Sequence, residues 1–198
     1  MAESTTSFIF WFKDHFLDLK RICSFFKISI VIFLFSSQIL PEERTTEQSS
    51  SFQRDSDAID IPFYTMENER TTLYEGLGGM DSGKLLLLNY TSSFCKPCKY
   101  EIPELLKIQE SNPKIVLWLI FVGDEPEAIY KKVAELKIPK NVIILKDPLE
   151  TSLKRMKISS LPITLVIRKD RKVSAYSIGY DAKKFLEFKS KINDILKN

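Results

Sequence analysis

The sequence has few cysteines, which form the disulfides of small secreted proteins, and few histidines, which bind metals. Its 198 residues include three cysteines and one histidine, His15. Three cysteines cannot form the disulfide framework of a cysteine-rich secreted scaffold. His15 lies near the N-terminus, so histidine chemistry is excluded from the main domain. A structural zinc site needs four ligands and is disfavoured, because the main domain offers only Cys95 and Cys98.

The excess of positive over negative charge is also small. The formal net charge is +3, and no run of Lys and Arg has the density that nucleic-acid binding requires. We therefore expect no nucleic-acid partner. The hydrophobic fraction of 44% is enough for a packed core, and the length suits one ordinary domain with an additional segment.

Residues 1–40 are expected to direct the chain to a membrane. An apolar run, ISIVIFLF at 28–35, follows several Lys and Arg residues and precedes the acidic stretch PEERTTEQ. This asymmetry predicts a cytoplasmic leader and export of everything that follows. The run is short for a span, which needs about 17–25 residues, and no clear cleavage site follows it. An uncleaved signal-anchor is favoured over a cleaved signal peptide, and a buried core helix remains a third interpretation.

The rest of the chain divides into a linker and a folded domain. Residues 41–58 are polar and rich in Ser, Thr and charge, which is typical of a linker. Residues 59–198 are expected to form the domain. Short apolar runs predict strands at 85–90, 115–122, 141–145, 163–167 and 173–178, with one or two edge strands within 61–73. Helical patterns predict helices at 101–111, 124–136, 147–156 and 182–196.

This alternation of strands and helices predicts an α/β fold. Strands that alternate with helices pair in parallel, and the closing hairpin at 163–178 adds an antiparallel strand. The expected architecture is a central mixed β-sheet flanked by helices. No internal repeat is present.

The motif Cys95-Lys96-Pro97-Cys98 lies between a buried strand and a helix. A helix N-terminus offers free N–H groups and the positive end of the helix dipole, and both favour a thiolate. Lys96 adds a positive charge, and Pro97 is tolerated where a helix needs no N–H. A structural disulfide would close too small a loop to remove much chain entropy, and a copper site would lack a neighbouring methionine. These features favour a redox-active dithiol.

Two segments resemble a known family. The stretch GKLLLLNYTSSFCKPCKYEIPEL at 83–105 is similar to the active-site segment of TlpA/ResA-type membrane-anchored, thioredoxin-like thiol:disulfide oxidoreductases. The second stretch, SSLPITLVIRKDRKVSAYSIGY at 159–180, resembles the part of that family that contains the active-site cis-proline. The resemblance covers 59–198 and implies a thioredoxin-like fold. The residues that match the first family pattern are Gly83, Lys84, Asn89, Cys95, Pro97, Cys98, Glu101, Pro103 and Leu105.

The chain departs from the family pattern at several positions. Phe94 stands before the first cysteine where Trp is usual, and Arg171 stands in the final hairpin turn where Gly is usual. Residues 90–93 also replace the aromatic run of the family. These differences affect the expected substrate surface and leave the dithiol intact.

The resemblance implies a role for each cysteine and for one carboxylate. Cys95 is expected to be the nucleophile that attacks a substrate disulfide, and Cys98 the residue that resolves the mixed disulfide. Glu101 is expected to exchange a proton with Cys98. Asn89 occupies the end of the buried strand, where thioredoxin carries an acid, but an amide cannot act as a base.

The remaining candidate residues concern substrate binding. The bond between Leu161 and Pro162 is expected to be cis, which would place the backbone of Leu161 beside Cys95 to pair with a substrate strand. Phe94, Lys96 and Pro97 are expected to contact the substrate. No metal and no cofactor are expected beyond the redox-active disulfide itself.

The expected function is that of an extracytoplasmic thiol:disulfide oxidoreductase that reduces protein disulfides. Its implied substrates are apocytochrome c or envelope proteins, with an upstream electron donor in the membrane. It would lie at the periplasmic face, anchored to the inner membrane or exported. A thiol peroxidase is an alternative, because Ser92 stands three residues before Cys95, but Leu88 replaces the proline of that motif. A non-catalytic binding or chaperone module is the third alternative.

Overall fold

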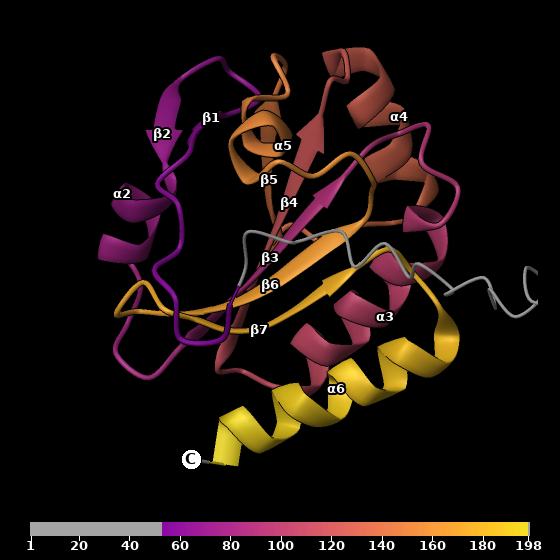
Figure 1. The fold of residues 1–198 in the computed structure, drawn as a ribbon. Coiled ribbons are helices and arrows are strands. Elements are labelled where there is room, and N and C mark those ends of the chain that lie inside the picture. The colour runs from indigo at the N-terminus through magenta and orange to yellow at the C-terminus, as the bar shows by residue number, and fades with distance from the viewer. Residues whose placement is uncertain (1–52, 198) are drawn as a thin grey trace, which may run out of the picture. The chain divides into compact units, whose positions relative to one another are not determined.

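The computed structural model describes residues 53–197, which form an α/β domain around a seven-stranded sheet (Figure 1). The strands are β1 (Pro62–Tyr64), β2 (Arg70–Thr72), β3 (Leu85–Thr91), β4 (Ile115–Val122), β5 (Ile143–Asp147), β6 (Ile163–Arg168) and β7 (Val173–Ile178). The helices are α2 (Leu73–Gly78), α3 (Cys98–Ser111), α4 (Pro126–Glu135), α5 (Thr151–Met156) and α6 (Ala182–Lys197).

The sheet is mixed, as the sequence predicted. Its strand order is β2-β1-β5-β4-β3-β6-β7. Strands β3, β4 and β5 run parallel, whereas β6 pairs antiparallel with both β3 and β7, and β1 pairs antiparallel with β5. Helices α3, α4 and α6 contribute to the apolar core on one face of the sheet, and α2 and α5 contribute to the core on the other.

Strand β3 lies at the centre of these layers. All of its residues are buried. Leu86, Leu88 and Tyr90 pack into one core, and Leu85 and Leu87 pack into the other. A strand that is covered on both faces needs apolar residues at every position, which explains the unbroken LLLL run.

Helix α2 was not predicted. It begins with a capping box, in which the Thr72 hydroxyl accepts the Glu75 N–H at 3.2 Å and the Glu75 carboxylate accepts the Thr72 N–H at 2.7 Å. The T-x-x-E spacing is a helix start that could have been read from the sequence. Strand β5 also begins two residues later than predicted, because residues 139–142 form a turn closed by the Val142 N–H and the Pro139 carbonyl.

Gly76 in α2 allows close contact with Trp118 of β4. A Cβ at this position would lie 1.8 Å from Cη2 of the Trp118 ring, which is 4% exposed. We expect Gly76→Ala to destabilise the domain by about 1–3 kcal/mol, because overpacking outweighs the higher helix propensity of alanine. Urea denaturation measures the difference.

The matched control is Gly78→Ala in the same helix, where a Cβ would have no neighbour within 4 Å. This substitution is expected to be neutral or to stabilise by up to about 1 kcal/mol. Equal effects of the two substitutions would contradict the assigned contact with Trp118.

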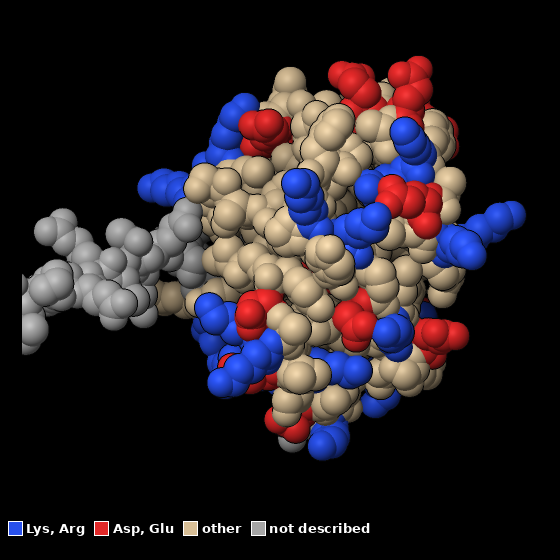
Figure 2. Space-filling view, turned by 90° about the vertical axis from the view of Figure 1, so that its right-hand side faces the viewer, with Lys and Arg blue, Asp and Glu red and all other residues tan. Residues whose placement is uncertain are grey.

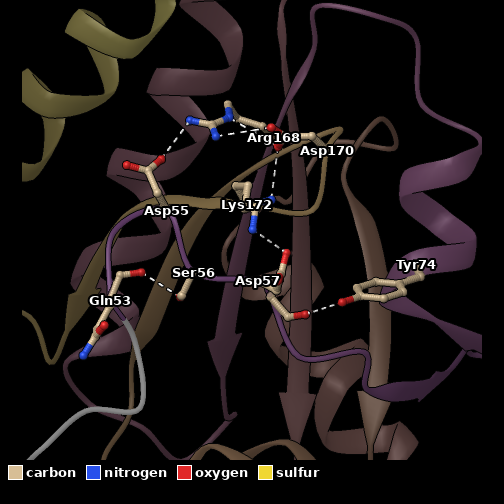
Figure 3. Close-up of polar contacts among 9 residues, drawn as sticks. Gln53, Asp55, Ser56, Asp57, Tyr74, Arg168, Asp170 and Lys172 are labelled. Atoms are coloured by element: carbon tan, nitrogen blue, oxygen red, sulfur yellow. Dashed lines mark hydrogen bonds and ion pairs between the residues drawn. The ribbon is translucent and has the colours of Figure 1, made fainter.

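Residues 53–58, the end of the expected linker, pair with the β6–β7 hairpin (Figure 3). The Asp55 N–H donates to the Val173 carbonyl at 2.8 Å. The Asp55 carboxylate contacts Arg168 at 3.2 Å, and Asp57 contacts Lys172 at 2.8 Å. These contacts attach the start of the described chain to the end of the sheet where β6 ends and β7 begins.

Tyr74 of α2 completes this attachment. Its hydroxyl donates to the Ala58 carbonyl at 2.6 Å, and Ala58 is 3% exposed. The Arg171 guanidinium lies over the Tyr74 ring, 4.1 Å from its centroid. Arg171 has a positive φ of 70°, the conformation for which the family pattern uses Gly, and its contact with the ring offsets part of that cost.

The predicted membrane-directed segment, residues 1–40, and most of the linker lie outside the described residues. Within residues 53–197, none of the helices combines the length and the apolar character that crossing a membrane requires.

Candidate active site

The two cysteines lie in the turn between β3 and α3 and form a disulfide. Their Cα atoms are 5.3 Å apart. Cys98, the first residue of α3, is 1% exposed, whereas Cys95 is half-buried. The Cys98 N–H points to Sγ of Cys95 at 3.2 Å. Cys95 therefore offers the accessible sulfur, and an N–H from the first helical turn is positioned to stabilise a thiolate there.

Asp124 holds the turn that precedes Cys95. Its buried carboxylate follows β4 and accepts hydrogen bonds from the Ser93 N–H at 2.8 Å and the Ser92 hydroxyl at 3.2 Å. The Ser93 hydroxyl also donates to it. The sequence placed Asp124 at the start of a helix, and its contact with a turn 31 residues earlier was not predicted.

The Leu161–Pro162 peptide bond is cis, as predicted. Pro162 directly precedes β6, and the next residue, Ile163, lies opposite Tyr90 in the β3–β6 pairing. Because β3 leads into the dithiol turn, Pro162 lies at the same end of the sheet as the cysteines. Leu161 and Cys95 also pack against the same apolar core.

Glu101 lies one helical turn after Cys98 and is fully buried. One carboxylate oxygen accepts a hydrogen bond from Nδ2 of Asn89 at 2.9 Å, and the other accepts one from the Thr164 hydroxyl at 3.0 Å. Asn89 also donates to Thr164 Oγ1 at 2.8 Å. The cluster therefore joins α3, β3 and β6 just below the dithiol.

Burial raises the pKa of Glu101 to about 7, although the hydrogen bonds from Thr164 and Asn89 act to lower it. A carboxyl group with this pKa can both accept and donate a proton near neutral pH. Its place one turn from Cys98 makes it a candidate proton acceptor for that thiol.

The fold is decided by comparison with solved structures. A Chlorobium tepidum protein, described as a candidate thiol:disulfide interchange protein DsbE, is 16% identical with a TM-score of 0.62, over 74% of this chain and 99% of the other. The thioredoxin domain of a Bacteroides vulgatus thiol-disulfide oxidoreductase is 17% identical with a TM-score of 0.59, over 74% and 99%. The chain has a thioredoxin-like fold. No family model matches the sequence, and no curated protein does.

The surface around the dithiol of this thioredoxin-like domain carries the residues that were predicted to contact substrate. Phe94 is 84% exposed, and Lys96 and Pro97 are exposed beside it. A hollow of about 340 Å³ lies between Phe94 and α4. On the side of the domain that carries α3 and α4, positive and negative side chains are interspersed with uncharged surface (Figure 2).

The thioredoxin-like domain thus brings most of the predicted site residues to one end of the sheet, above the buried Glu101. Sequence reasoning missed Asp124 and the contact of Thr164 with Glu101. Among residues 53–197, no cluster of His, Cys, Asp and Glu could hold a metal ion.

Proposed function

We propose that the chain is a thiol:disulfide oxidoreductase that reduces protein disulfides. One observation carries the proposal: Cys95 and Cys98 form a disulfide with one accessible and one shielded sulfur, one turn from a buried carboxyl group whose pKa is about 7. The names of the similar structures, a thiol:disulfide interchange protein and a thiol-disulfide oxidoreductase, support the same chemistry.

The reaction begins with both cysteines reduced. The Cys95 thiolate attacks one sulfur of a substrate disulfide, forms a mixed disulfide and releases the other substrate sulfur as a thiolate, which takes a proton from water. Cys98 then gives its proton to the Glu101 carboxylate. The Cys98 thiolate attacks Sγ of Cys95 and releases the second substrate sulfur as a thiolate, and the proton held by Glu101 is then available to protonate it. Two electrons have moved to the substrate, and Cys95 and Cys98 are again joined.

The rates of disulfide reduction and of peroxide consumption, measured on the same protein, test this function. We expect the reduced full-length chain to reduce insulin disulfides at a rate well above that of free dithiothreitol, and to consume hydrogen peroxide no faster than a free thiol. The Ser92 hydroxyl donates a hydrogen bond to Asp124 at 3.2 Å. It therefore holds the turn and is not free to donate to a bound peroxide. Fast peroxide consumption without disulfide reduction would support a peroxidase, and neither activity would support a binding module.

The proposal places the domain outside the cytoplasm. A positive flank before the apolar run at 28–35 supports this orientation, and reduction in an oxidising compartment would require an electron donor in the membrane. Apocytochrome c and envelope proteins are the proposed substrates. A reporter enzyme that is active only after export, fused after Asn198, should be active, and a silent reporter would contradict the topology.

A further inference from the structure

Thr164 closes a ring of hydrogen bonds with Asn89 and Glu101. Its hydroxyl donates to Oε1 of Glu101 at 3.0 Å and accepts from Nδ2 of Asn89 at 2.8 Å, and all three side chains are fully buried. We propose that Thr164 is a positioning residue that allows Glu101 to gain and lose a proton while it stays buried. The inference rests on the proposed function, in which Glu101 accepts the proton of Cys98.

A hydroxyl suits this role because it can both donate and accept. When Glu101 is ionised, Thr164 donates to the carboxylate. When Glu101 is protonated, the carboxyl O–H can donate to Thr164 Oγ1 across the same contact once the hydroxyl hydrogen rotates away. A methyl group at this position can neither donate nor accept a hydrogen bond in either state. The buried Glu101 carboxyl group would then lose a hydrogen-bond partner, which is costly in a protein core.

Asn89 supplies a second, independent observation. Its amide oxygen, Oδ1, is buried and has no hydrogen-bond partner among the described residues. Protonation of Glu101 adds one hydrogen to the cluster, which then needs one more acceptor. If the amide turned over, Oδ1 would occupy the position of Nδ2, which lies 2.8 Å from Thr164 Oγ1 and 2.9 Å from Glu101 Oε2. The cluster therefore contains an acceptor for the additional hydrogen, at the cost of the two hydrogen bonds that Nδ2 now donates.

Burial has the largest effect on the charge of Glu101, and its hydrogen-bond partners are the groups that favour the ionised carboxylate against it. The facing partners on β3 and β6 are Asn89 and Thr164, which are uncharged, and Cys98 is the titratable neighbour on α3. Burial raises the pKa of Glu101, and the hydrogen bond from Thr164 is the largest effect that lowers it. Without the hydroxyl, the carboxyl group should stay protonated to a higher pH.

The test is the titration of Glu101 in the full-length chain, followed through the ¹³C NMR signal of its side-chain carboxyl group. That signal is identified by its loss in Glu101→Gln. Thr164→Val is expected to raise the pKa by about one unit, the effect of losing a hydrogen bond to a charged group. Thr164→Ser, which restores the hydroxyl, should return the pKa to near its original value. Thr164→Ala provides a smaller hydroxyl-free side chain in case valine prevents folding.

Thr91 offers a matched control. It is fully buried at the end of β3, and its hydroxyl has no hydrogen-bond partner among residues 53–197. Thr91→Val should leave the pKa of Glu101 unchanged. An unchanged pKa in the hydroxyl-free variants of Thr164, or an equal shift in Thr164→Ser, would overturn the inference. If the predicted shifts occur but the wild-type chain reduces no disulfide, the proposed function is wrong and the hydrogen-bond assignment stands.

Discussion

A Cys98→Ser variant of the full-length chain will remain covalently attached to protein disulfide substrates through Cys95. The attack on the substrate needs only the accessible sulfur of Cys95, whereas release needs the shielded thiol of Cys98. Removing the resolving thiol therefore stops the reaction at the mixed disulfide. Non-reducing electrophoresis followed by mass spectrometry measures the trapped species and identifies the substrate.

The reciprocal variant, Cys95→Ser, is the control. Its remaining thiol is 1% exposed in the disulfide form, so little or no adduct is expected. In the reduced wild-type chain, iodoacetamide should likewise modify Cys95 well before Cys98. Equal adducts in both variants, or faster labelling of Cys98, would contradict the assigned order of the two cysteines.

A Glu101→Gln variant will lose the pH dependence that the carboxyl group confers on the second step. Because the pKa of Glu101 is about 7, the wild-type rate of resolution should change between about pH 6 and pH 8. The amide has a similar volume but does not titrate. Loss of the negative charge should also lower the pKa of the Cys98 thiol. Single-turnover reduction from pH 5.5 to 9 measures both effects, and superimposable wild-type and variant profiles would remove Glu101 from the mechanism.

The stability of the Glu101→Gln variant should also depend less on pH than that of the wild type. The pKa of Glu101 is raised from 4.5 in the unfolded chain to about 7 in the folded domain, so the folded state holds a proton that the unfolded state releases between these values. The stabilising contribution is complete below about pH 4.5 and is lost as the pH rises through 7. Wild type should lose about 3 kcal/mol relative to Glu101→Gln between pH 4.5 and pH 8. Urea denaturation of both proteins at the two pH values gives this difference.

The sequence predicted the elements whose signals are local. The unbroken apolar run at 85–88 indicated a buried strand, and the cysteine motif was placed between that strand and α3, which begins three residues earlier than predicted, at Cys98. The burial of Glu101 was not predicted, although Cys98, Glu101, Leu105 and Ile108 share the buried face of α3. Helix α2 was missed although its capping box is also a local signal.

The partners of the site could not be predicted, because they depend on how distant segments pair. Thr164 reaches Glu101 across 63 residues through the β3–β6 register, and Asp124 reaches Ser93 across 31. A one-residue shift in that register would point Thr164 to the opposite face of the sheet. The reacting cysteines could therefore be identified from the sequence. The residues that bind Glu101 and the turn before Cys95 could be identified only from the three-dimensional structure.

The most direct test of the proposed oxidoreductase function counts the electrons that leave the dithiol. Reduced full-length chain is mixed with an oxidised protein disulfide, quenched in acid, alkylated and analysed by mass spectrometry. The account predicts that one Cys95–Cys98 disulfide forms for each substrate disulfide that is reduced, and that a Cys95→Ser, Cys98→Ser double variant transfers none. Substrate reduction without formation of this disulfide, or a Cys95–Cys98 pair that stays reduced beside excess substrate, would contradict it.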